Sequence, residues 1–299
     1  MTGAEIVGAG FAAAKGAKKI ADALGGDAKE QEQLSRLAED TKALEVAANA
    51  RADRVAIRQL VLTKLYAPLA KWVGYKSDYF DNHFADDMAE KLADVPEEHI
   101  TSPSPIVAAQ SMEGLSYSLD EPDLKEMYLN LLATASDDRR AHEAHPSYAQ
   151  LIKQLAPREA GCLEDVLKSA AKGTIVPIAE LRNSKAGGTS GRVHYTHLVN
   201  LVDLVTGVAI EDPDYPMFVD NWVRLGLVLV DYSASITRED AYDWVESRPE
   251  YESASAEVAD QEGRQVTIHK GVMRVTALGK RFYEAVSRDS QARTNGGGL

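Results

Sequence analysis

The sequence predicts a mainly α-helical protein in which N-terminal helices and a central helical bundle precede a C-terminal α+β domain of winged-helix type. Three observations support this fold class. Capping residues delimit four short helices within residues 104–167, apolar residues recur there at three- and four-residue spacing, and strand-like patterns begin only after residue 172. Because 299 residues exceed the usual size of a single core, more than one domain is expected.

Residues 1–26 form a small-residue segment for which the composition predicts only weak order. Gly8, Gly10 and Ala13 match the spacing of a dinucleotide-binding turn. The context argues against such a site, because no buried strand of sufficient length precedes the glycines and a long helical pattern follows them. No cofactor is therefore predicted. Helix pairing or contact with a membrane surface stays an alternative for this segment.

Residues 27–95 carry the predicted N-terminal helices. A short apolar seam consists of Leu34, Leu37, Leu44 and Ala48. Because the seam is short, packing against its own domain is favoured over a coiled coil. The next helix spans residues 55–73 and breaks before Pro68. A further helix, which precedes a linker at 96–104, has an apolar face made of Phe80, Phe84, Met88 and Leu92.

Residues 104–172 form the predicted central helical bundle. Ser104 caps the first helix and Pro105 occupies its first position, where no N–H donor is needed. Asp120 caps the second helix, whose buried face consists of Leu124, Met127, Tyr128, Leu131, Leu132 and Ala135. Pro146 and Pro157 open the third and fourth helices.

Two stretches, YLNLLATASD at 128–137 and HPSYAQLIKQLAPREAGCLEDV at 145–166, resemble the abortive infection alpha family of bacterial proteins. The resemblance continues through NWVRLGLVLV at 221–230 and RVTALGKRFYEAV at 274–286. Since that family is associated with phage-immunity loci, the resemblance implies a role in phage defence but no particular reaction. The family-motif residues are Tyr128, Asn130, Leu131, Leu132, His145, Pro146 and Leu155.

The pattern of residues 173–289 indicates the winged-helix-like α+β domain. Strands are predicted at 174–181, 227–232 and 265–275. Helices are predicted at 195–205, at 214–225 before Gly226, and after Thr276, which caps the final helix. A flexible loop is expected at 185–191 and an acidic insertion, taken as a long wing, at 238–262. Residues 290–299 are expected to form a disordered tail.

A winged helix makes DNA binding an alternative function. The residues that would then contact nucleic acid are Lys270, Arg274, Lys280 and Arg281. The net charge is −13, however, and the predicted recognition helix contains Asp214 and Asp220. Because an acidic surface repels phosphate groups, nucleic-acid binding is disfavoured.

A charged turn at 137–140 is predicted to be exposed. The candidate interaction loop consists of Arg139, Arg140, His142 and Glu143, because loops carry function more often than cores do. No metal site is predicted, since His142 and His145 are three residues apart and Pro146 ends any helix that contains both. The His145 ring is expected to bond to nearby backbone at a helix start.

Cys162 is the only cysteine of the chain, so no internal disulfide can form, and its place beside an apolar helix face favours packing over nucleophilic chemistry. The most apolar segment, at 198–210, is too short to span a bilayer and contains Asp203. No transmembrane segment is predicted, and a cytoplasmic protein is expected.

Three functions from different classes follow. The leading one is an effector or accessory component of phage defence that acts through contacts with a protein partner or a second copy. The second is a winged-helix DNA-binding regulator, and the third is an enzyme with an unrecognised active site. No paired carboxylates, Ser-His-Asp spacing or phosphate loop supports the enzyme, so no catalytic residue is predicted.

Overall fold

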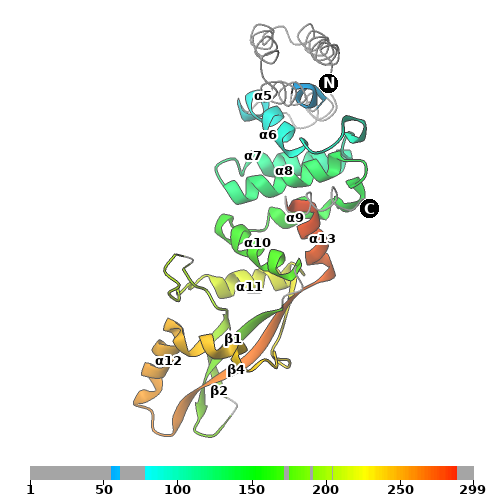
Figure 1. Ribbon diagram of the computed structural model, residues 1–299. Helices are drawn as coiled ribbons and strands as arrows, with labels where there is room; N and C mark the ends of the chain where they lie inside the picture. Colours follow the sequence, from blue (N-terminus) through cyan, green and yellow to red (C-terminus); the bar gives the residue numbers. More distant parts are fainter. Residues whose placement is uncertain (1–54, 61–77, 172–174, 189–190, 204, 288–299) are drawn as a thin grey trace, which may run out of the picture. The chain divides into compact units, whose positions relative to one another are not determined.

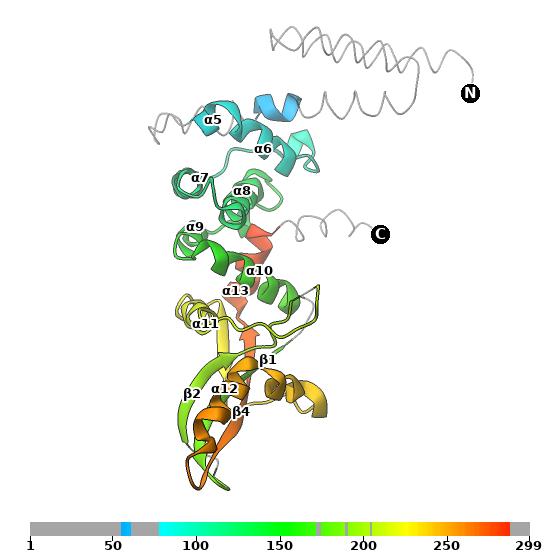
Figure 2. The same cartoon turned by 90° about the vertical axis from the view of Figure 1, so that its left-hand side faces the viewer.

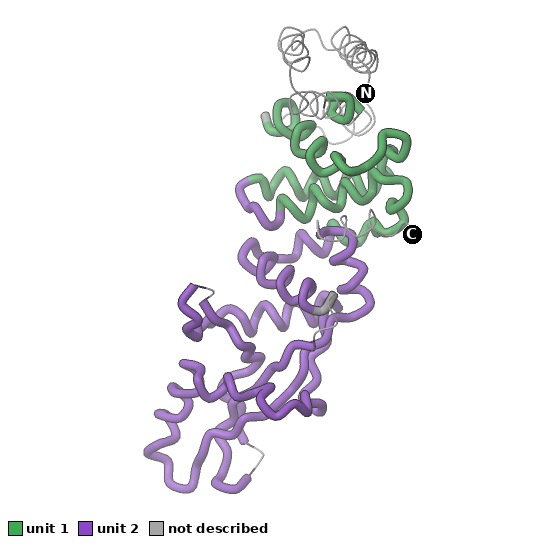
Figure 3. Tube along the Cα trace, in the orientation of Figure 1, with its two compact units in different colours: residues 1–119, 125–149 green, residues 120–124, 150–299 purple. Residues whose placement is uncertain are grey.

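The computed structural model describes residues 55–60, 78–171, 175–188, 191–203 and 205–287 (Figure 1 and, turned by 90°, Figure 2). The predicted turn at 8–13, the seam at 34–48, the break before Pro68 and the C-terminal tail lie outside these residues. The chain divides into two compact units (Figure 3). Unit 1 comprises residues 1–119 and 125–149, and unit 2 comprises residues 120–124 and 150–299.

The described part of unit 1 is mainly helical. Its elements are α5 (Asp78–Asn82), α6 (Phe84–Lys91), the 3-10 helix η2 (Glu97–His99), α7 (Pro105–Ser116), most of α8 (Pro122–Ser136), the 3-10 helix η3 (Ala141–Glu143) and the start of α9 (Ser147–Ile152). The predicted apolar face Phe80, Phe84, Met88 and Leu92 is buried. These residues belong to two helices and not to one, because the helical conformation is interrupted at His83 between α5 and α6.

Helices α7 and α8 begin where the prolines predict. Pro105 is the first residue of α7 after Ser104, and Pro122 is the first residue of α8. The Tyr128 ring of α8 lies so close to Gly114 of α7 that a Cβ atom at Gly114 would collide with it. A glycine at this position therefore lets the two helices approach closely.

Unit 2 is built on a four-stranded antiparallel sheet in the order β2-β1-β4-β3. The strands are β1 (Val176–Lys185), β2 (Gly191–Leu198), β3 (Val228–Asp231) and β4 (Arg264–Val275). Strand β1 pairs with β4 along its whole length, from Val176 opposite Met273 to Lys185 opposite Arg264. It also forms a hairpin with β2, so β2 and β3 are the edge strands.

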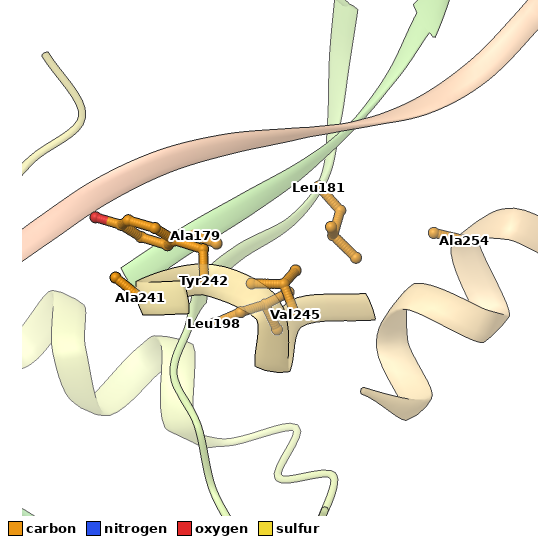
Figure 4. Close-up of a cluster of buried hydrophobic side chains, with 7 residues drawn as sticks. All are labelled: Ala179, Leu181, Leu198, Ala241, Tyr242, Val245 and Ala254. Atoms are coloured by element: carbon orange, nitrogen blue, oxygen red, sulfur yellow. The ribbon is translucent and has the colours of Figure 1, made fainter. Parts of the chain in front are cut away.

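One face of this sheet is apolar and covered. The 3-10 helix η4 (Glu239–Ser247) and α12 (Pro249–Ala259) pack on it, and the shared core consists of Ala179, Leu181, Leu198, Ala241, Tyr242, Val245 and Ala254 (Figure 4). Because side chains alternate along a strand, Glu180 and Arg182 of β1 lie on the opposite face. The remaining helices of unit 2 are α10 (Pro157–Ala171), α11 (Tyr215–Arg224) and α13 (Ala277–Val286).

The fold class is mixed α/β, so the prediction of a mainly α-helical protein with a winged-helix-like C-terminal domain is wrong. The helix predicted at 195–205 does not form, because the chain up to Leu198 belongs to β2 and pairs with β1. A short apolar run can be either helix or strand, and a partner strand decides between them. The acidic segment at 238–262 is not a wing, since η4 and α12 contribute Tyr242 and Ala254 to the core.

The start of α13 is capped as the sequence predicts. The Thr276 hydroxyl accepts a hydrogen bond from the Gly279 backbone N–H at 2.9 Å and donates one to the Gly226 carbonyl oxygen at 2.6 Å. Gly226 follows α11 with a φ of 74°, a conformation that favours glycine. Thr276 therefore links the start of α13 to the chain that leaves α11.

Replacing Thr276 by alanine should lower the free energy of unfolding by about 1 kcal/mol, because the N–H group of Gly279 loses its acceptor. Thr276→Ser keeps the hydroxyl and should stay close to the wild type. Urea denaturation of the two variants measures the difference. Equal stability of the alanine and serine variants would show that this cap does not contribute.

Candidate functional site

The family-motif residues lie in the buried interior of the protein and at helix ends. The buried members are Tyr128, Asn130, Leu131, Leu132 and Leu155. His145 and Pro146 precede α9, and Nδ1 of His145 accepts a hydrogen bond from the Ser147 backbone N–H at 3.2 Å. The predicted bond between the His145 ring and nearby backbone is thus confirmed. These residues pack and cap helices.

The candidate interaction loop lies between α8 and α9. Arg139 and His142 are exposed, whereas Arg140 is buried and paired with Glu143. The prediction that the whole turn at 137–140 is exposed is wrong, because Asp137 and Arg140 are only 3% and 5% exposed. Each has an oppositely charged partner in the loop, as the burial of a charge requires.

The candidate nucleic-acid contacts are exposed and lie on two elements, Lys270 and Arg274 on β4 and Lys280 and Arg281 on α13. The Lys270 ammonium group lies 5.2 Å from the centre of the Tyr242 ring. A guanidinium nitrogen of Arg274 lies 3.4 Å from the Asp231 carboxylate. Because unit 2 is not a winged helix, the DNA-binding alternative loses its structural basis.

Metal and thiol chemistry find no support in the described residues. Within those ranges, no group of three or more His, Cys, Asp or Glu side chains is arranged to hold a metal ion. Cys162 on α10 is half-buried, and burial raises the pKa of its thiol above the ordinary value. A thiol with a raised pKa is a poor nucleophile at neutral pH, because the thiolate is the reactive form.

A chain of hydrogen bonds joins three polar residues of unit 2 that lie far apart in the sequence. The Tyr232 hydroxyl lies 3.0 Å from Nδ1 of His197 and accepts a hydrogen bond from the His197 backbone N–H at 3.1 Å. Nε2 of His197 lies 3.1 Å from a carboxylate oxygen of Asp220 on α11. The arrangement is satisfied when the hydroxyl donates to Nδ1 and Nε2 carries the proton that Asp220 accepts.

His197 also has an unusual backbone conformation. Its φ is 55°, and it is the one non-glycine residue with a positive φ in the part of the chain that the structure describes. Such a conformation costs on the order of 1–3 kcal/mol and persists only where the surroundings hold it. The bonds to Tyr232 and Asp220 hold it here. The local sequence pattern does not indicate this site, because it predicts a helix at 195–205 and because His197, Asp220 and Tyr232 are brought together only by the tertiary fold.

The Tyr232 ring is nearly parallel to two imidazole rings. Its centre is 6.0 Å from that of His197 and 5.5 Å from that of His269, with interplanar angles of 17° and 18°. Nδ1 of His269 lies 3.2 Å from the Glu180 carboxylate. A Cβ atom at Gly271 would collide with the Tyr232 ring, so the glycine makes room for it. Burial raises the pKa of Tyr232 to about 12, and the hydroxyl therefore stays protonated at neutral pH and orients His197.

His197 lines a pocket of about 160 Å³ in unit 2. Its walls include Tyr195 of β2, Pro213 before α11, and Tyr215 and Pro216 at the start of α11. Tyr215 is held by the Trp222 ring, whose centre lies 5.6 Å away at an interplanar angle of 85°. The pocket thus has rigid aromatic and proline walls.

Arg248 is the arginine of this pocket, and its guanidinium group is already bonded. Nε and Nη2 donate to the two Glu250 carboxylate oxygens at 3.0 and 2.7 Å. Nη1 donates to the Leu201 carbonyl oxygen and Nη2 to the Ile210 carbonyl oxygen, each at 2.7 Å. The two charged side chains are only 1% and 5% exposed. This buried pair holds both ends of the 201–210 segment.

Tyr232→Phe removes the hydroxyl that both accepts from and donates to His197. We expect the free energy of unfolding to fall by about 1–3 kcal/mol, because the His197 backbone N–H and Nδ1 lose their partner while the strained φ remains. Urea denaturation measures the change, with Tyr251→Phe on α12 as the matched control. A Tyr232→Phe variant as stable as this control would mean that the hydroxyl does not hold His197.

In the described part of the chain, no helix has the length and apolar character needed to cross a membrane. No curated protein matches the chain. A solved structure, that of the uncharacterized protein from the hydrocarbon-degrading marine bacterium Alcanivorax borkumensis SK2, is similar at 17% identity over 50% of this chain and 94% of that chain, with a TM-score of 0.31. The family model described as abortive infection alpha matches residues 76–286, and the chain therefore belongs to the abortive infection alpha family.

Proposed function

We propose that this protein is an effector or accessory component of phage defence by abortive infection, and that it acts through contacts with another protein. Membership of the family suggests an abortive-infection-related role. The observation that supports protein contact is the ordered surface loop at 137–143. A loop held in one conformation loses little entropy when it binds, which favours recognition of a partner.

The first half of the loop is anchored to the segment that precedes α7. Asp137 forms an antiparallel bridge with Ile100, and the Asp138 backbone N–H donates to the His99 carbonyl oxygen at 2.9 Å. The Asp137 carboxylate accepts hydrogen bonds from Nε and Nη2 of Arg139 at 2.8 and 2.6 Å. The Arg139 side chain and the backbone of this half of the loop are thereby held in one conformation.

The second half of the loop has its own ion pair. Nε and Nη2 of Arg140 donate to one carboxylate oxygen of Glu143 at 2.9 and 2.8 Å. Because the Arg140 side chain is only 6% exposed, this pair holds the loop from its protein-facing side. Arg139 and His142 are the exposed members of the candidate interaction loop, and they are the residues that a partner would meet.

Phage challenge of a sensitive host, with the neighbouring genes supplied, tests the proposal. The wild-type chain should reduce plaque formation, and the His142→Glu variant, which changes an exposed loop residue and leaves the ion pairs of the loop intact, should lose this protection while remaining folded. Arg238→Gln, which alters an exposed residue outside the loop, is the control and should protect like the wild type.

Unchanged plaquing with the wild-type chain would contradict the role in defence. Full protection by the folded His142→Glu variant would instead contradict the loop as the contact surface. Arg139 and Arg140 are left intact, because each belongs to an ion pair with a buried member, and removing one partner of such a pair destabilises the fold itself.

The stability of the loop should depend on pH through Asp137. Burial alone would raise the pKa of this carboxyl group, but hydrogen bonds from Arg139 outweigh burial and hold the pKa below its ordinary value. The stabilisation is therefore present above the unfolded-state value of about 3.9 and is lost as the pH falls through the lower folded-state value. Asp137→Asn should be less stable than the wild type at neutral pH. The difference in free energy of unfolding between the wild type and Asp137→Asn, measured by urea denaturation, should become smaller as the pH is lowered. A difference that does not change with pH would contradict the pairing of Asp137 with Arg139.

A further inference from the structure

We infer that the pocket beside His197 binds a basic side chain, arginine or lysine, of a partner protein. The pocket lies in unit 2, whereas the interaction loop lies in unit 1. Failure of one proposal would therefore leave the other standing. Three properties of the pocket carry the inference, namely its size, its charge and the apolar segment beside it.

The volume of the pocket limits the size of its occupant. A cavity of about 150 Å³ holds one benzene molecule, and drug-sized ligands need about 300 Å³ or more. At about 160 Å³ the pocket has room for one side chain. Its tyrosine and proline walls, Tyr195, Pro213, Tyr215 and Pro216, suit the apolar stem of lysine or arginine and the cation–π contact of its charged end.

The charge of the pocket selects a cation. Its carboxylates are Glu211, Asp212 and Glu250. Glu250 is neutralised by Arg248, and Asp212 is paired with Arg158, which also contacts Asp214. Glu211 is exposed and adds a negative charge at the rim. An anion would find Arg248 already committed to Glu250 and two carbonyl oxygens, so a cationic group fits better.

The segment at 201–210 forms a small hairpin beside the pocket, with Val202 bridged to Ala209. Its turn is ordered by the Asp203 carboxylate, which accepts hydrogen bonds from the Val205 and Thr206 backbone N–H groups at 3.0 and 2.6 Å. The described residues of the hairpin include four exposed branched apolar residues, Val202 at 38%, Val205 at 93%, Val208 at 63% and Ile210 at 43%. An ordered apolar surface next to an acidic pocket is suited to a protein that covers the hairpin and inserts a basic residue.

Titration of the full-length, ¹⁵N-labelled chain with butylguanidinium, followed by NMR, tests the charge selection. Saturable shifts are expected at pocket residues such as His197 and Leu201. Butylurea has a similar shape without the charge and should bind at least about tenfold more weakly, since hydrogen bonds to charged groups are the stronger ones. Equal binding of the two probes, or no saturable shift with butylguanidinium, would overturn the inference.

Two variants test whether butylguanidinium binds in the pocket. Leu201→Trp should fill the pocket and abolish the shifts, and Glu211→Gln should weaken butylguanidinium binding by about threefold, as for a partly exposed ion pair. Glu262→Gln, an exposed carboxylate outside the pocket, is the matched control and should bind like the wild type. Unchanged binding in both Leu201→Trp and Glu211→Gln would place the probe elsewhere and overturn the inference.

A capped Leu-Arg-Leu peptide tests whether the occupant belongs to a protein. It should bind more tightly than butylguanidinium, because its leucines can contact the hairpin. The Val205→Ser/Val208→Ser variant should lose this gain and keep the affinity for butylguanidinium. A peptide that binds no better than butylguanidinium would indicate a small free cation as the occupant and would contradict a protein partner.

Discussion

The antiparallel pairing of β1 with β4 is the contact on which the rest of unit 2 depends. It joins residues 176–185 to residues 264–273, so it closes a long loop whose entropic cost must be offset by contacts between distant residues. The ladder brings Ala179 and Leu181 opposite Lys270 and Ile268, and η4 and α12 cover this face. The segment between the strands therefore adds to the core instead of extending from it as a wing.

The same ladder separates two chemistries on the two faces of the sheet. On the covered face, Tyr242 of η4 donates from its hydroxyl to the Gly271 carbonyl oxygen at 2.7 Å, which fixes η4 to β4. On the other face, Glu180 and His269 are directly opposite each other, and the Tyr232 ring lies over Gly271. Gly271 thus has a structural role on both faces of the sheet. It accepts a hydrogen bond on one side and leaves room for an aromatic ring on the other.

Ion pairs with a buried arginine support the two surfaces for which we propose protein contacts. Arg140 pairs with Glu143 within the loop of unit 1, and Arg248 pairs with Glu250 in the wall of the pocket of unit 2. Such pairs add little net stability, because desolvation offsets the attraction between the charges. Their directional hydrogen bonds can instead select one arrangement of the loop or hairpin above them. We regard the loop and the pocket as separate surfaces, each defined within its own unit.

The sequence by itself determined the helix starts at Pro105, Pro157 and Thr276, the strands around 228–231 and 264–275, and the buried faces of α6 and α8. These features depend on caps, prolines and apolar spacing within a few residues, so a local pattern contains them. Only the tertiary structure decided that Tyr195 to Leu198 form a strand, that Arg140 is buried, and that Asp220, His197 and Tyr232 meet beside a pocket. The physical reason is that strand pairing, burial and a hydrogen-bonded site depend on partners tens of residues away. The pattern of apolar and polar residues within a segment does not reveal these partners.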